Sequence, residues 1–228
     1  MKLFVPSYQT PGTWLENLRF LEPMEWIDGV ELLLFSYDSE SRDSFMAELA
    51  SLKEYSRRFS FTLHLPDPLP SLGAGDDPAG LMRLLDATEA LAGHYVLHPP
   101  RNEDLNSWAA LLAAARDSHG KERFLLEYTG KQAFDTALGA APDLLLCADT
   151  GCLLREGIDP AAWISQRAPR VKEIHLHGAA GPKDHRALDP KDAWALDIVR
   201  LAKENGWIVN LETFSIAETL KSRAVLWR

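Results

Sequence analysis

Short apolar runs alternate with longer amphipathic segments along the whole chain, and this alternation limits the possible folds more than any other feature. The runs consist mainly of Val, Ile, Leu and Phe, which is typical of strands buried on both faces of a parallel sheet. Eight runs are predicted to be strands, at 2–7, 29–36, 59–65, 95–98, 123–128, 143–149, 171–177 and 207–213.

The segments between these runs carry apolar residues at spacings of three and four, which predicts helices, for example at 41–58, 79–92, 105–118 and 192–205. A repeat of about 28 residues is close to the minimum for a strand–helix unit. The pattern therefore predicts an α/β protein with a parallel, eight-stranded (β/α)8 TIM barrel, compact beside the ~250 residues typical of that fold. A doubly wound open sheet is the alternative, but no glycine-rich fingerprint follows the first strand.

Neither a linker nor a low-complexity tract divides the chain, so residues 1–228 are predicted to form one domain. The net charge of −9 argues against binding to nucleic acid, whose phosphates are also negative. Two cysteines, Cys147 and Cys152, are too few for a secreted disulfide framework. The chain also lacks a signal-peptide pattern and an apolar run of membrane-spanning length. We therefore expect a cytoplasmic protein with no membrane partner.

Polar side chains mark the ends of six successive predicted strands, the third to the eighth. In a (β/α)8 barrel these carboxyl ends meet at one face, where the chemistry takes place. The six residues are His64, His98, Glu127, Asp149, His175 and Glu212. Carboxylates gathered there would repel one another unless a cation lay between them. Because zinc, manganese and iron all accept His, Asp and Glu ligands, the pattern predicts a divalent metal site, with zinc the first choice.

Each of these residues also has a structural explanation. A single strand-end histidine is more often a satisfied polar residue than a ligand, and Asp149 can cap the following turn. Cys152 can be an ordinary buried thiol. However, five of the seven histidines fall at one predicted end of the barrel or in the loop that follows it, at His64, His98, His175, His177 and His185. This concentration favours the metal site.

The order of these residues resembles that of the xylose isomerase-like barrels, and more closely that of the apurinic-endonuclease family 2 branch. The pattern spans 64–212 and runs His, His, Glu, Asp-x-x-Cys, His-Leu, Glu. The resemblance implies two or three metal ions. The central site would consist of Glu127, Asp149, His175 and Glu212. A second site would use His64 and His98, with Glu127 bridging.

A third site in that branch would use Cys152 together with His185. Here the chain departs from the family pattern. Cys152 stands where the family usually has histidine, and Asp184 and His185 are adjacent where the family separates the two residue types by one position. A thiolate is a competent zinc ligand, so a third ion remains compatible with the sequence.

Two function classes fit the central site, and both assign catalytic roles to Glu127 and Glu212. In the first, metal ions activate a water that hydrolyses a phosphoester. In the second, one ion polarises a ketose while the two glutamates transfer protons, as in an isomerase or epimerase. The additional imidazoles of His64 and His98 favour hydrolysis. The negative charge and short chain argue against action on abasic sites in DNA, so a small phosphodiester is the expected substrate.

The segments HLPDPLP and VLHPP resemble the cobamide-remodelling phosphodiesterases, which cleave the nucleotide loop of corrinoids. This resemblance implies a corrinoid substrate. A non-catalytic barrel with a degenerate site is a third hypothesis. Segment 66–80, rich in Pro, Gly and Asp, is predicted to be an exposed wall or lid beside the site. The predicted substrate contacts are His177, Arg101, Lys183 and Arg186.

Overall fold

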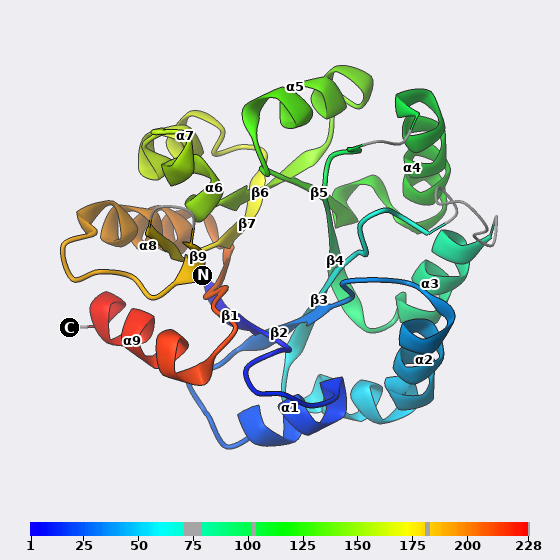
Figure 1. The fold of residues 1–228 in the computed structure, drawn as a ribbon, viewed down its shortest axis with the longest axis horizontal. Helices are drawn as coiled ribbons and strands as arrows, with labels where there is room; N and C mark the ends of the chain where they lie inside the picture. Colours follow the sequence, from blue (N-terminus) through cyan, green and yellow to red (C-terminus); the bar gives the residue numbers. More distant parts are fainter. Residues whose placement is uncertain (71–78, 102–103, 181–182, 228) are drawn as a thin grey trace.

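The computed structural model describes residues 1–70, 79–101, 104–180 and 183–227. Parallel strands close into a barrel in the order β1-β10-β7-β6-β5-β4-β3-β2 (Figure 1). The eight barrel strands are β1 (Lys2–Pro6), β2 (Gly29–Leu33), β3 (Ser60–His64), β4 (Ala92–Leu97), β5 (Phe124–Glu127), β6 (Leu145–Asp149), β7 (Val171–His175) and β10 (Ile208–Asn210). The predicted (β/α)8 barrel is thus confirmed.

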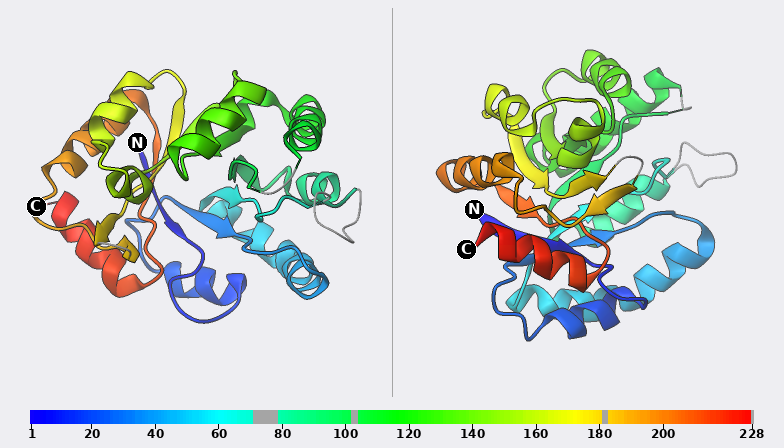
Figure 2. Two further views of the ribbon diagram at one scale, coloured as in Figure 1. Left: turned by 45° about the horizontal axis from the view of Figure 1, so that its top comes forward. Right: turned by 60° about the vertical axis from the view of Figure 1, so that its left-hand side comes forward.

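Helices follow the barrel strands and lie outside the ring, as the views along and across it show (Figures 1 and 2). They are α1 (Trp14–Leu21), α2 (Ser39–Glu54), α3 (Gly80–Thr88), α4 (Leu105–His119), α5 (Lys131–Ala140), α6 (Thr150–Arg155), α7 (Pro160–Gln166), α8 (Ala193–Asn205) and α9 (Ile216–Leu226), with short 3-10 turns η1 (Tyr55–Arg57) and η2 (Lys121–Arg123). No helix within the described ranges is long and apolar enough to cross a lipid bilayer.

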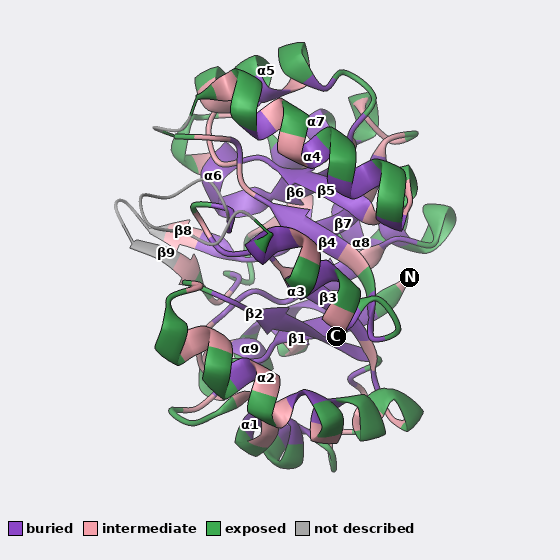
Figure 3. Ribbon diagram, turned by 90° about the vertical axis from the view of Figure 1, so that its right-hand side faces the viewer, coloured by how far each residue is buried: buried purple, intermediate pink, exposed green. Residues whose placement is uncertain are grey.

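Apolar side chains cover the outer face of the barrel wall, whereas the inner face carries both apolar and buried polar side chains. The main hydrophobic cluster joins the outward faces of the strands to the helices, which explains why the buried colour follows the strands while the outer faces of the helices are exposed (Figure 3). Val96, Leu125 and Cys147 form a separate buried cluster. Because they alternate with main-cluster residues along their strands, they point to the barrel interior. Below the mouth, this part of the interior is closed by packing.

A two-stranded antiparallel hairpin, β8 (Gly178–Ala180) and β9 (Lys183–Arg186), follows β7 where the sequence predicted a loop. It lies at the end of the barrel opposite the N-terminus (Figure 3). The strands β7 and β10 are also shorter than predicted. Their ladder ends where His175 pairs with Asn210. Glu212 therefore lies two residues past the end of its strand.

Candidate metal centre

The side chains predicted at the strand ends converge on the mouth of the barrel. A pocket of about 440 Å³, here called the mouth pocket, opens there and is lined among others by His64, His98, Glu127, Asp149, His185 and Glu212. Four triads of described residues place their donor atoms within 4.8 Å of one another: His64, His98 and Glu127; Glu127, Asp149 and His175; Glu31, His175 and Glu212; and His177, His185 and Glu212. All six predicted strand-end residues therefore belong to at least one potential metal-binding group.

The first triad is built from the ends of β3, β4 and β5. Oε2 of Glu127 lies 2.9 Å from Nε2 of His64 and 3.3 Å from Nε2 of His98. The other ring nitrogens are engaged elsewhere: Nδ1 of His64 is 2.9 Å from the carbonyl oxygen of Leu65, and Nδ1 of His98 is 3.1 Å from Asp67. These outer contacts orient both Nε2 atoms toward the same carboxylate.

Glu127 also belongs to the second triad, through its other oxygen. Nδ1 of His175 lies 3.6 Å from Oε1 of Glu127 and 3.2 Å from Oε2 of Glu212. Asp149 completes this group and also caps α6, because its Oδ1 accepts a hydrogen bond from the backbone N–H of Cys152 at 2.6 Å. The two roles that the sequence suggested for Asp149, a metal ligand and a cap of the following turn, are therefore compatible.

The last of the four triads consists of His177, His185 and Glu212. Nε2 of His177 lies 3.3 Å from Asp149 and 3.7 Å from Glu212, and the side chain is fully buried. This residue, predicted to contact substrate, thus lies beneath the mouth pocket among the metal-binding groups. Nδ1 of His185 lies 3.6 Å from Oε2 of Glu212.

Cys152 is not a member of any of the triads that the described residues form. Its Sγ accepts a hydrogen bond from Arg155 at 2.8 Å, and burial together with the neighbouring Asp149 raises the pKa of its thiol. A role for Cys152 as a third-site ligand remains a prediction. The side chain of Asp184 lies outside the described part of the structure.

The other predicted contacts have different positions. Arg101 lines the mouth pocket, with its Nε 2.8 Å from Asp67. Arg186 instead points to α9, 3.9 Å from Glu218, and is not among the described residues that line the pocket. The side chain of Lys183 lies outside the described residues, as do positions 71–78 of the predicted lid.

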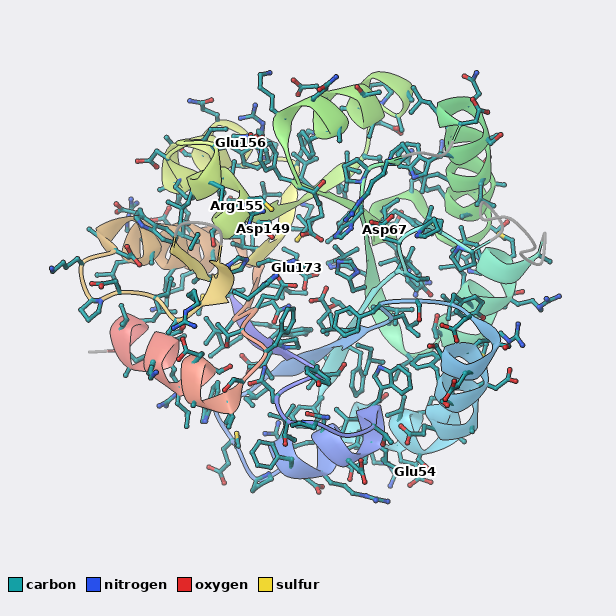
Figure 4. The ribbon with its side chains drawn as sticks, viewed as in Figure 1. Glu54, Asp67, Asp149, Arg155, Glu156 and Glu173 are labelled. Atoms are coloured by element: carbon teal, nitrogen blue, oxygen red, sulfur yellow. The ribbon has the colours of Figure 1, made fainter. Side chains whose placement is uncertain are left out.

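Two acidic residues that the sequence analysis did not select contact histidines of the triads. Asp67 contacts His98, as described above. Glu31, fully buried in β2, lies 3.2 Å from Nε2 of His175. Figure 4 shows Asp67 and Asp149 near the centre of the barrel and Glu54 at its outer edge. The sequence did contain a signal for Glu31, because it is a charged residue within the apolar run 29–36.

Electrostatics explain how these buried ionisable groups coexist. Burial alone would raise the pKa of Glu127, but His98 and His175 hold it well below its usual range. Burial likewise opposes ionisation of Glu212, and mainly His175 lowers its pKa to about 2. Burial opposes protonation of His98, yet Glu127 and Asp67 raise its pKa to about 10. The carboxylates thus require positive charge beside them, which is what a divalent cation provides.

The residues present fit such a cation. Nδ1 of His175 and Oε2 of Glu212 are buried and have no hydrogen-bond partner among the described residues, although they lie 3.2 Å apart. Buried polar atoms are rarely left in this state. Both are ligand atoms that zinc, manganese and iron accept. His64, His98 and Glu127 can hold one ion, and Glu127, Asp149, His175 and Glu212 can hold another.

Metal binding is expected to release protons. Because the pKa of His98 is raised to about 10, this ring is protonated at pH 8 and a cation must displace its proton. Raising the pH toward 10 weakens this competition, so apparent zinc affinity should increase by about tenfold per pH unit and per proton released. Calorimetric titration in buffers with different ionisation heats measures the release. A pH-independent affinity between pH 7 and 9 would contradict the raised pKa.

Removing Glu31 is expected to weaken metal binding. Without its carboxylate, Nε2 of His175 loses the partner that orients Nδ1 toward the centre, and the loss of such an outer partner typically weakens metal affinity by about 10- to 100-fold. We expect Glu31→Ala to weaken metal affinity by about 100-fold and Glu31→Gln by about 10-fold. The affinities are measured by competition with a chelator of known affinity.

A matched control for Glu31 is Glu173, another buried interior carboxylate. Burial and the nearby Glu31 raise the pKa of Glu173 to about 8, so it is largely neutral at pH 7 and Glu173→Gln changes the charge little. The Glu173→Gln variant should therefore bind metal with the affinity of the wild type. Wild-type affinity in both Glu31 variants would show that His175 does not depend on this contact.

No protein-family model matches the chain, and no curated protein sequence matches it. Solved structures do match over nearly the whole chain. The probable 3-DHS dehydratase AsbF from Bacillus anthracis, involved in petrobactin synthesis, superposes with a TM-score of 0.69 at 13% identity, covering 99% of this chain and 97% of that one. Endonuclease IV from Thermus thermophilus gives 0.62 at 17% identity and 99% coverage of both chains.

The 3-keto-D-glucoside 4-epimerase YcjR from E. coli, in its apo form, gives a TM-score of 0.61 at 13% identity, covering 99% of this chain and 97% of that one. These three structures are xylose isomerase-like barrels. At such low identity the likeness establishes the fold alone: this chain shares the (β/α)8 barrel of these three structures, and residues at its mouth could bind metal. The predicted resemblance is confirmed at this level.

Proposed function

We propose that the protein is a metal-dependent phosphodiesterase that hydrolyses a small phosphodiester. The observation that carries this proposal is the position of Glu127, whose two oxygens face two separate triads, one with His64 and His98 and one with Asp149 and His175. Cations held side by side in this way activate water and neutralise charge on a phosphate. A single-ion enzyme has no need of the first triad.

The mouth pocket suits an anionic substrate. Arg101 and Arg155 both line it, and guanidinium groups favour the approach of a phosphate. His64 and His98 hold their ring planes through outer contacts, so the donor atoms are positioned before any ligand arrives. Zinc is the preferred ion, with manganese or iron as alternatives, and two or three ions are compatible with the groups described above.

A second candidate is a ketose isomerase or epimerase. It is favoured by the pair Glu127 and Glu212, whose carboxylates flank Nδ1 of His175 at 3.6 Å and 3.2 Å and could donate and accept protons at neighbouring carbons. This candidate leaves His64 and His98 unexplained, so we prefer hydrolysis. Action on abasic DNA and a non-catalytic role rank lower, the former because of the charge of −9.

The nucleotide loop of a cobamide is our candidate phosphodiester. Its support is the resemblance of HLPDPLP, at 64–70, and VLHPP, at 96–100, to the cobamide-remodelling phosphodiesterases. Asp67 and His98, one from each segment, lie 3.1 Å apart in the structure. The two segments therefore contribute to one wall of the mouth pocket, where they could contact such a substrate.

The test combines metal analysis of the purified protein with parallel assays on a phosphodiester panel, which includes cobalamin and abasic-site DNA, and a ketose panel. We expect two or more equivalents of metal per chain and turnover of phosphodiesters. One equivalent with ketose turnover would support the isomerase instead. Absence of bound transition metal and of both activities would support the non-catalytic barrel.

A further inference from the structure

One side of the barrel mouth is aromatic. Tyr8, Phe35 and Phe214 follow β1, β2 and β10, which are neighbours in the barrel. The ring centroids of Tyr8 and Phe35 are 6.3 Å apart, and those of Phe35 and Phe214 are 6.1 Å apart, both edge-to-face. We call these three residues the aromatic rim. The ring of Phe35 thus lies between the rings of Tyr8 and Phe214, and these two contacts define its orientation.

The aromatic rim touches the metal-binding groups directly. Phe214 packs on His185 with ring centroids 4.4 Å apart, and both Phe35 and Phe214 line the mouth pocket. Phe35 is nevertheless 64% exposed, the highest value among the large hydrophobic side chains of the described residues. A single exposed apolar residue needs no explanation, but an ordered group of rings bordering a polar pocket indicates a binding surface.

A second pocket lies behind Phe35. This side pocket, of about 130 Å³, is lined by Tyr8, Trp14, Leu33 and Phe35 among others. Leu33 and Phe35 line both pockets and so separate them. For comparison, an apolar cavity of about 150 Å³ is large enough to hold benzene. The space beside the aromatic rim therefore matches one six-membered ring.

The mouth pocket is also lined by charged residues. Asp67 and Arg101 form an ion pair there at 2.8 Å, and Arg155 lines the pocket close to Asp149 (Figure 4). The pocket thus combines an apolar aromatic edge, charged residues and the metal-binding groups. A ligand that matches all three carries an anionic group at the centre and an apolar ring to one side.

We propose that the aromatic rim binds a planar aromatic or heteroaromatic group attached to the phosphate of the substrate. The inference rests on the proposed function insofar as a phosphate occupies the metal-binding groups. It adds a substrate class, because a phosphodiester with a ring on one arm should bind better than one with only small alkyl arms. Stacking of this ring against Phe35 would provide the preference.

The test uses binding, so it does not depend on turnover. Phenylphosphonate and methylphosphonate, which cannot be hydrolysed at the phosphorus–carbon bond, are titrated into the zinc-loaded protein by calorimetry. We expect phenylphosphonate to bind about tenfold more tightly. In Phe35→Ala this ratio should fall to about two or less, while methylphosphonate affinity stays as in the wild type. Phe35→Leu, which keeps apolar area without a ring, should give an intermediate ratio.

Phe20 provides the matched control, since it is an exposed phenylalanine on α1, 39% exposed, that lines neither pocket. Phe20→Ala should keep the wild-type ratio. Equal affinities for the two phosphonates, an unchanged ratio in Phe35→Ala, or no binding of phenylphosphonate would each overturn the proposal. Failure of the phosphodiesterase assays with a preserved phenyl preference would instead reject the proposed reaction and leave the aromatic subsite standing.

Discussion

Replacing Glu127 with Gln is expected to reduce bound metal to one equivalent or less and to lower phosphodiester hydrolysis by more than about 100-fold. The reason is that one carboxylate faces both triads: its Oε2 lies beside His64 and His98, and its Oε1 beside His175. The neutral amide has the same shape but removes the negative charge that both ions require. Because loss of an outer partner alone costs about 10- to 100-fold, loss of a shared ligand should exceed that range.

Glu173→Gln is the control for this replacement, since it makes the same substitution in another buried carboxyl group of the barrel interior, one that is largely neutral at pH 7. It should keep both metal and activity. Metal content is measured by elemental analysis, activity with the best substrate of the phosphodiester panel, and folding by thermal unfolding of both variants. A folded Glu127→Gln protein that retains two equivalents of metal would show that Glu127 does not bridge two ions.

Replacing His98 with Ala is expected to remove one equivalent of metal and to lower hydrolysis by more than about 100-fold, while the second ion remains. His98 contacts the first triad only, through Nε2 at 3.3 Å from Glu127, and Asp67 orients it from the other side. The other predicted ligands, Asp149, His175 and Glu212, are unchanged by this substitution. A single-ion isomerase would not need His98, so this variant separates the two candidate functions.

His94 is the matched control, because it lies on the same strand, β4, and lines a pocket with Phe4 and Lys2 away from the metal-binding groups. His94→Ala should keep the wild-type metal content and activity. Full hydrolytic activity in His98→Ala would instead mean that His98 is not a ligand. Preserved ketose turnover in that variant would support the isomerase.

The fold could be predicted because its signal is local and repeated. Each strand is a short apolar run and each helix an amphipathic segment, so the order of elements follows from periodicity alone. Strand boundaries were less accurate: β2, β7 and β10 end before their apolar runs do, and β4 begins three residues earlier than predicted. The β8–β9 hairpin was missed, because its two short strands carry glycine and charged residues and lack the apolar alternation typical of a strand.

The candidate site could be predicted only in part. Ligand-type residues at strand ends were recognisable because parallel strands bring those ends together. The residues that orient these ligand-type side chains were not recognisable. Glu31 contacts His175 across 144 positions of sequence, and nothing in the local sequence indicates that distance. The aromatic rim was missed for the same reason, since its three rings come from three separate loops.

The amino-acid sequence by itself determined the closed barrel and the type of donor atoms at its mouth, since both depend on the order of residues along each strand. Only the tertiary structure decided how those donors are shared. The division of Glu127 between two triads, the burial of His177 beneath the pocket and the position of Phe35 at the edge of the mouth pocket depend on barrel closure and loop packing. These are contacts between distant segments, whose distances are set by packing of the whole molecule.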